Sequence, residues 1–297
     1  MDSRLDIPQI ASRASRIIEI LAREHPSRSG LFPERLHAAA EFIEREFQAL
    51  GYAVESQRYI SEGSTVRNLI AELPGKDQSK PIIVLGAHYD TVPGTPGADD
   101  NASGVAGLLE LARLLKDSSR SRTIKFVAFT HEEPPYFYTS QMGSRQYAKA
   151  LKRQKQKILV MFSLEMIGYA GEHLNQMYPF VLLRQLMGYP KNGSFIGLVG
   201  NIRTMRLVKL VCTTMRESCS VGVESLSAPG FLPPLFLSDH SSFWRRGYPA
   251  IMVTDTAFLR NPHYHLPSDT EGTINYSFLA EVVRGLVCAV QSLDRLK

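Results

Sequence analysis

Side chains that can bind a metal ion directly follow three apolar runs of this sequence. His88 comes after IIVLGA, Glu132 and Glu133 come after KFVAFTH, and Glu165 comes after ILVMFSL. Imidazole and carboxylate groups without thiolates are typical of zinc sites, with manganese or cobalt as alternatives. We therefore expect a metal centre whose ligands come from the ends of several strands.

The first of these segments continues into a loop rich in Gly and Pro, GAHYDTVPGTPGADDNASG. Residues i and i+2 of a strand lie on the same face, so Asp90 can accept the second ring N–H of His88 and orient the imidazole. A lone His-x-Asp pair is a weak signal. The same pair at the end of an apolar strand, followed by Asp99 and Asp100 in a flexible loop, is a much stronger one.

Glu132 and Glu133 are adjacent, so one carboxylate can bind a metal ion while the other faces substrate as a base. Without a cation, two neighbouring acids raise each other's pKa. A second imidazole comes from HYH (residues 263–265), and two imidazoles with several carboxylates are more ligands than one zinc ion needs. The set therefore favours two metal ions that share a bridging carboxylate.

The segments that position these side chains predict an α/β protein. We expect buried strands at 81–90, 123–133, 157–169, 195–200 and 249–256, and helices at 7–24, 33–50, 102–117, 144–154 and 275–296. Strands alternating with helices predict a mostly parallel sheet covered on both faces, with functional groups beyond the carboxyl ends of its strands. Two alternating segments, 54–60 and 65–73, predict an antiparallel hairpin at one edge. We expect a single domain, 1–297.

Composition excludes several functional classes. The net charge of +5 is mostly dispersed, and KRQKQK (residues 152–157) reads as a solvated helix end, so no nucleic-acid partner is expected. The sequence has no run of 18 apolar residues, so we expect no membrane span. The N-terminus does not resemble a signal peptide. Three cysteines without a disulfide framework favour a reducing compartment, so we expect a cytoplasmic protein.

The motifs GAHYDTV, PGADDNASG, FVAFTHEEP, SLEMIGY, SDHSSFW and YHLPSDT occur in this order between residues 82 and 270. Together they resemble the di-zinc aminopeptidase family, which also includes glutamate carboxypeptidase, aminopeptidase Y and the glutaminyl cyclases. The resemblance implies a three-layer α/β/α sandwich with a mostly parallel mixed central sheet, of the zinc exopeptidase type.

The resemblance also implies residue roles. It implies two zinc ions with five ligands: His88, Asp100, Glu133, Glu165 and His265. Asp100 bridges the ions and precedes a cis peptide bond, and Asp99 has no role. Glu165 stands where the family usually has Asp, which puts the metal spacing in question. Among the two nearby histidines, His265 is preferred over His263 as the ligand.

The same resemblance implies that Glu132 is the general base and that Asp90 supports His88. Tyr264 is either a donor to the oxyanion or a packing residue. The segment SDHSSFW suggests that Asp239 and His240 build a pocket wall, or that Ser238 or Asp239 caps a helix, and Trp244 is expected in the core. Residues 134–138 suggest an aromatic rim near Glu132.

We therefore expect a zinc-dependent aminopeptidase that removes N-terminal residues from peptide or aminoacyl substrates. One alternative is a glutaminyl-cyclase-like acyltransferase, whose chemistry needs one zinc ion. Another is a metal-free binding domain on the same fold. The sequence carries no indication of the oligomeric state or of the preferred substrate side chain.

Overall fold

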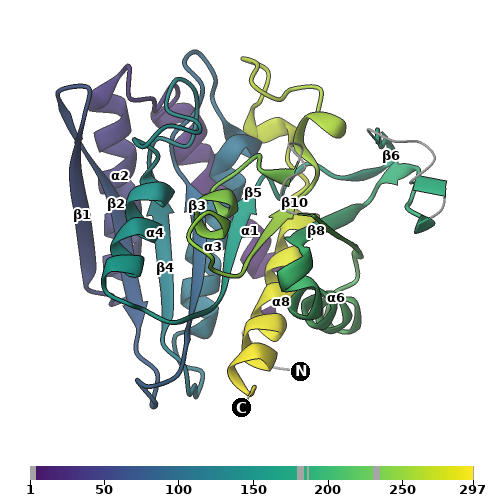
Figure 1. Ribbon diagram of the computed structural model, residues 1–297. Helices are drawn as coiled ribbons and strands as arrows, with labels where there is room; N and C mark the ends of the chain where they lie inside the picture. The colour runs from purple at the N-terminus through teal and green to yellow at the C-terminus, as the bar shows by residue number, and fades with distance from the viewer. Residues whose placement is uncertain (1–4, 179–183, 186, 230–234, 297) are drawn as a thin grey trace.

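The computed structural model describes residues 5–178, 184–185, 187–229 and 235–296. Its centre is an eight-stranded mixed sheet with the strand order β1-β2-β4-β3-β5-β10-β8-β9 (Figure 1). The strands are β1 (Val54–Ser61), β2 (Ser64–Leu73), β3 (Ile82–His88), β4 (Ile124–Phe129), β5 (Ile158–Glu165), β8 (Phe195–Asn201), β9 (Gly222–Ala228) and β10 (Ala250–Thr254). A separate pair, β6 (Gly171–Asn175) and β7 (Asn192–Gly193), forms a small second sheet.

Helices cover both faces of the large sheet, which confirms the predicted three-layer sandwich. One face packs against α1 (Ile7–Glu19), α2 (Pro33–Ala49), α3 (Gly104–Leu115), α6 (Met205–Ser218) and α8 (Tyr276–Asp294). The other face packs against α4 (Gly143–Arg153) and the short α7 (His240–Trp244). A π-helical turn, η2 (Ile20–Glu24), continues α1. The segment η3 (Ala98–Ser103) precedes α3 and is kinked, because Asp100 and Asn101 have non-helical φ and ψ angles. Three 3₁₀ turns cover Ile202–Thr204, Ala257–Leu259 and Glu271–Thr273.

The central strands follow from their composition. β3 is buried at every residue, as a strand covered on both faces must be. It pairs in parallel with β4 and β5, and β5 pairs in parallel with β10, so the carboxyl ends of all four strands meet at one edge. The hairpin β1–β2 pairs antiparallel at the side of the sheet, as predicted.

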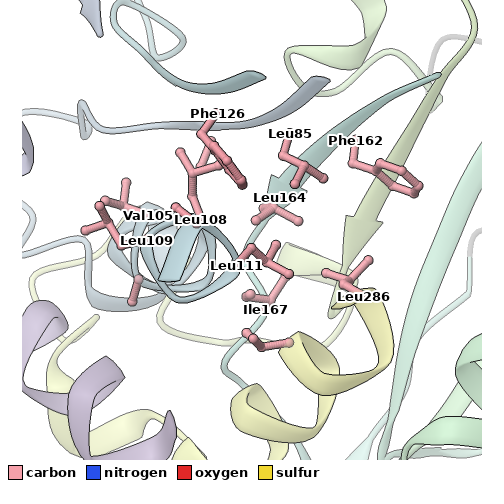
Figure 2. Close-up of a cluster of buried hydrophobic side chains, with 14 of the residues drawn as sticks. Leu85, Val105, Leu108, Leu109, Leu111, Phe126, Phe162, Leu164, Ile167 and Leu286 are labelled. Atoms are coloured by element: carbon pink, nitrogen blue, oxygen red, sulfur yellow. The ribbon is translucent and has the colours of Figure 1, made fainter. Parts of the chain in front are cut away.

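The larger core lies between the sheet and the α1–α3–α8 layer. Figure 2 shows Leu85, Phe126 and Phe162 of the strands directed toward leucines of α3 and toward Leu286 of α8. Among the described helices, α8 alone has the length and mean hydropathy (1.2) of a membrane span, but 61% of that window is buried in the protein. Packing in this core accounts for its apolar composition.

The sequence missed several elements. It did not predict β6, β7, β9 or α7, which are short or carry no clear periodicity. It merged η2 with α1, and it placed the start of the helix after the Gly- and Pro-rich loop inside η3. The basic segment 152–157 covers the last two residues of α4 and the turn after it, and it is largely exposed, as predicted for a solvated helix end. All three cysteines are free thiols, and Cys212 is buried.

Candidate metal centre

His88, the last residue of β3, lies among carboxylates. Its fully buried ring places Nε2 3.4 Å from Oδ1 of Asp100 and 3.4 Å from Oε2 of Glu165. The same nitrogen lies 3.9 Å from Oε2 of Glu132. On the other side of the ring, Nδ1 lies 3.1 Å from the backbone oxygen of Asp90. One ring nitrogen is therefore held by the backbone, and the other is directed at three acids.

Asp100 faces two imidazoles. While its Oδ1 lies near His88, its Oδ2 lies 3.2 Å from Nε2 of His265. The peptide bond between Asp100 and Asn101 is cis, as the resemblance implied. The Asn101 side chain donates to the backbone oxygen of Leu164 over 2.8 Å and thereby ties this turn to the end of β5, next to Glu165.

The turn that presents Asp100 depends on Gly97 and Asp269. Gly97 has φ 62°, and a Cβ there would lie 2.4 Å from the backbone oxygen of Asp100, so only glycine fits. The carboxylate of Asp269 accepts the backbone N–H groups of Asp99 and Asp100 at 2.9 and 3.0 Å. No role was predicted for Asp269, because its position in YHLPSDT resembles an ordinary turn.

Asp99 is buried and does not belong to the metal-capable groups of the described residues, in agreement with the preference for Asp100. It still has a structural role that the sequence did not suggest. Its Oδ1 accepts the N–H of Gly168 at 3.0 Å, and its Oδ2 accepts the side-chain amide of Asn261 at 2.8 Å. Asp99 therefore joins η3 to the segments after β5 and β10.

Asp90 holds the backbone of the two glutamates. Its oxygens accept the N–H groups of Glu132 and Glu133 at 3.1 and 3.0 Å. The same carboxylate lies 3.6 Å from Nδ1 of His88, which is longer than a hydrogen bond. Asp90 thus lies beside His88, as predicted, but its hydrogen bonds go to the loop after β4.

His265 completes the cluster from the loop after β10. Its Nε2 lies 3.2 Å from Oε2 of Glu133, and its ring stacks on Tyr264 with 3.7 Å between centroids. His263 instead places Nδ1 2.9 Å from the hydroxyl of Ser268 and lies outside the metal-capable groups of the described residues. Burial, followed by the carboxylates of Asp100 and Glu133, raises the pKa of Tyr264, so its hydroxyl stays protonated.

These side chains form two groups of three that share one residue. The first contains His88, Asp100 and Glu165, and the second contains Asp100, Glu133 and His265. In each group the potential ligand atoms lie within 4.8 Å of one another. A third group, His88 with Glu132 and Glu133, meets the same criterion, so Glu132 lies beside the two.

The carboxylates of the cluster lie close together in the protein interior, where a bound cation would compensate their negative charge. Burial and the neighbouring Asp100 carboxylate raise the pKa of Glu133 to about 8. Asp100 Oδ1, Glu133 Oε1 and His265 Nε2 are buried, and none has a hydrogen-bond partner within the described part of the chain. Buried polar atoms without partners are costly, and imidazole nitrogens with carboxylate oxygens are ligands that divalent zinc accepts. The residues present therefore fit a metal centre.

Further groups beside the centre were not assigned a clear role from the sequence. Ser238 donates its hydroxyl to Oε2 of Glu165 at 2.5 Å. The fully buried Asp239 precedes α7 without a side-chain capping bond, so the predicted cap is absent, and neither of its carboxylate oxygens has a partner among the described residues. Only the motif SDHSSFW could have indicated them. Trp244 packs against the second core cluster, as expected.

The aromatic residues predicted to form a rim near Glu132 differ in their exposure to solvent. Tyr136 is buried and stacks on His131 with 3.7 Å between ring centroids, so it does not face solvent. Tyr138 is 38% exposed, and the ring of Phe137 packs against the ring of Tyr138 with 4.1 Å between centroids. Phe137 and Tyr138 remain as the rim near Glu132.

Comparison with known proteins identifies the family. Peptidase family M28 matches residues 68–290, which include every residue of the cluster. The chain belongs to peptidase family M28. It is 42% identical to the uncharacterized protein YfbL of Escherichia coli over 272 residues, covering 89% of this chain and 82% of YfbL. It is also 37% identical to aminopeptidase YwaD of Bacillus subtilis over 115 residues, which cover 38% of this chain and only 24% of YwaD.

The structure of this M28 protein is similar to that of BSAP, a zinc aminopeptidase from Bacillus subtilis. It superposes with a TM-score of 0.73 and 18% identity, covering 97% of this chain and 96% of BSAP. A glutaminyl cyclase from Bacteroides thetaiotaomicron superposes with a TM-score of 0.70 and 17% identity, covering 97% and 98%. At these identities the similarity concerns the fold, which confirms the expected zinc exopeptidase architecture.

Proposed function

We propose that this M28 protein is a zinc-dependent aminopeptidase that hydrolyses the N-terminal bond of peptide or aminoacyl substrates. The observation that carries the proposal is the position of Asp100, whose two carboxylate oxygens face two different imidazoles. One zinc ion would be held by His88, Asp100 and Glu165, and a second by Asp100, Glu133 and His265. The aminopeptidases among its relatives and structural neighbours support this activity.

When bound, the zinc ions supply Lewis acidity, which polarises a carbonyl group and acidifies a water molecule. Glu132 supplies the proton transfer. Burial raises its pKa well above the ordinary value, and the carboxylates of Glu165 and Glu133 add to this effect against the opposing influence of His88. A carboxylate with a raised pKa accepts a proton near neutral pH and can return it to the leaving amine.

Two further residues support this step. The carboxylate of Asp90 accepts the backbone N–H groups of Glu132 and Glu133 and thereby holds the backbone of the base and of its neighbour in place. The hydroxyl of Tyr264, kept protonated beside the carboxylates, can donate a hydrogen bond to a developing oxyanion.

The test combines zinc content with hydrolysis of a panel of aminoacyl p-nitroanilides. Glu132→Gln should keep the wild-type zinc content and lose about 10²- to 10⁴-fold in kcat. Glu41→Gln, an exposed change on α2, is the matched control and should leave both unchanged. Full hydrolysis by the Glu132 variant would show that Glu132 is not the base.

The same preparation separates the alternatives. Absence of both bound zinc and anilide hydrolysis in the wild-type protein would reject the proposal in favour of a binding domain. A peptide with N-terminal glutamine distinguishes the cyclase: ring closure with release of ammonia, without cleavage of the peptide bond, would identify an acyltransferase.

A further inference from the structure

Two arginines lie beside the ring of Tyr138, which follows Glu132 in the same loop, and a third lies next to one of them in the sequence. Arg145 is the third residue of α4, and Arg245 and Arg246 directly follow α7. The guanidinium carbons of Arg145 and Arg245 lie 5.9 and 5.8 Å from the centroid of the Tyr138 ring. We call Arg145, Arg245 and Arg246 the arginine group.

The arginine group has no acidic partner within the described part of the chain. Burial lowers the pKa of Arg145, and the neighbouring Arg245 and Arg246 lower it further, whereas Tyr138 is the one group that raises it. Two guanidinium nitrogens of Arg145, Nε and Nη2, are buried without an acceptor among the described residues. Several other arginines of the described chain pair with glutamates, among them Arg13, Arg16, Arg67 and Arg216.

The fold fixes this positive charge beside the glutamates. Tyr138 belongs to the loop that begins with Glu132, and its hydroxyl donates to the backbone oxygen of Phe236 at 2.9 Å. Burial raises the pKa of Tyr138, and the charge of Glu132 adds to this effect. The hydroxyls of Ser144 and Ser242 lie 2.9 Å apart and hold α4 against α7. Arg145 in α4 and Arg245 directly after α7 therefore lie on two helices that pack against each other.

We propose that the arginine group is a subsite for a carboxylate of the substrate, beside Tyr138 in the loop that also carries Glu132. Guanidinium groups bind carboxylates through paired N–H bonds, and Arg245 and Arg246 are exposed and free to do so. An extended peptide spans about 3.3–3.6 Å per residue. A short peptide cleaved at Glu132 thus brings either its C-terminal carboxylate or an acidic side chain to the arginine group. The inference rests on the proposed aminopeptidase activity.

The experiment compares four substrates that share an N-terminal leucine: Leu-p-nitroanilide, Leu-Gly-Gly, Leu-Gly-Gly-amide and Leu-Gly-Asp-amide. Arg145→Gln and Arg245→Gln should each lower kcat/KM about tenfold for a peptide with a carboxylate, the size expected for a charge-assisted hydrogen bond. Neither variant should change hydrolysis of the anilide or of Leu-Gly-Gly-amide, which also shows that the variants are folded and active.

Arg206→Gln is the matched control. Arg206 is an exposed arginine of α6, which begins at the end of β8 opposite the metal centre, because β8 runs antiparallel to β10. Selective loss with Leu-Gly-Gly identifies the C-terminal carboxylate as the ligand, and selective loss with Leu-Gly-Asp-amide identifies an acidic side chain.

Equal changes on charged and uncharged peptides, or no change on any of them, would overturn the subsite while leaving the aminopeptidase activity intact. Absence of wild-type hydrolysis of the anilide and of all peptides would overturn both.

Discussion

Ser238 donates its hydroxyl proton to Oε2 of Glu165 across 2.5 Å, and Ser163 Oγ lies 3.0 Å from Ser238 Oγ. All three side chains are buried at the end of β5. Glu165 occupies a position where the resemblance implies Asp, and its extra methylene gives the carboxylate more freedom. The two serines restrict that freedom and hold the carboxylate near His88.

Ser238→Ala should therefore weaken zinc binding about 10- to 100-fold, the range observed when a partner that orients a metal ligand is removed. The loss should be seen in a zinc titration of the metal-free protein. Ser140→Ala, an exposed serine in the loop before α4, is the control. Equal zinc affinity of Ser238→Ala and wild-type protein would show that Glu165 is held by other contacts.

Glu133→Gln should lower the zinc content from two ions to one per chain. The variant removes one carboxylate from the group of Asp100, Glu133 and His265 and leaves the group of His88, Asp100 and Glu165 complete. Metal analysis after dialysis against a weak chelator measures the result. Retention of two zinc ions would contradict the assignment of Glu133 as a ligand.

Much of the fold was accessible from the sequence because apolar runs and amphipathic periods are local. The run IIVLGAH is buried at every residue, and the helix that begins at Pro33 ends just before Gly51, whose φ of 82° suits a helix terminus. His88, Glu132, Glu133 and Glu165 were singled out for the same reason, because each stands at the end of a strand or in the loop that follows it.

The rest of the site depends on contacts that spacing does not encode. Arg28, which donates to the backbone oxygens of Tyr89 and Gly97, comes from the segment before α2. Ser238 and Asp239 come from a segment more than 70 residues beyond β5. Asp99 and Asp100 are neighbours of the same type, and only the backbone of η3 decides which one faces the histidines. The sequence therefore identified ligand candidates but missed most of the groups that hold them in place.

Asp239 should make the metal-free protein less stable as the pH rises. Burial, with the carboxylates of Glu165 and Asp90, raises its pKa from 3.8 to about 7 against the opposing influence of His88. Between about pH 4 and pH 7 the unfolded chain has lost this proton while the folded protein retains it. The folded state then binds more protons, so the free energy of unfolding falls across this range.

Asp239→Asn removes this titration. Relative to wild-type protein, the variant should gain about 2–4 kcal/mol of stability between pH 4 and pH 8. Thermal unfolding of the two metal-free proteins at both pH values measures the difference, with the exposed Asp117→Asn as the control. A pH-independent difference would show that Asp239 ionises as readily in the folded protein as in the unfolded chain.

Arg28 should be the residue whose loss damages the loop of Asp90 and Asp100 most. Its fully buried guanidinium donates to the backbone oxygens of Tyr89, Leu21, Pro96 and Gly97, at 2.7, 3.0, 2.6 and 2.6 Å. Burial lowers its pKa to about 10, so it remains charged at neutral pH, near the carboxylates of Asp269 and Asp100.

Arg28→Met leaves these backbone oxygens without a donor and removes a buried positive charge, so we expect a loss of about 3–5 kcal/mol in the free energy of unfolding. Arg28→Lys keeps the charge but cannot reach four carbonyls, and its loss should be intermediate. Arg23→Met removes an exposed arginine that pairs with Glu19 and Glu271 and should have little effect on the free energy of unfolding, because solvent screens such pairs. Urea unfolding of the metal-free proteins ranks the three variants, and equal losses for Arg28→Met and Arg23→Met would contradict a supporting role for Arg28.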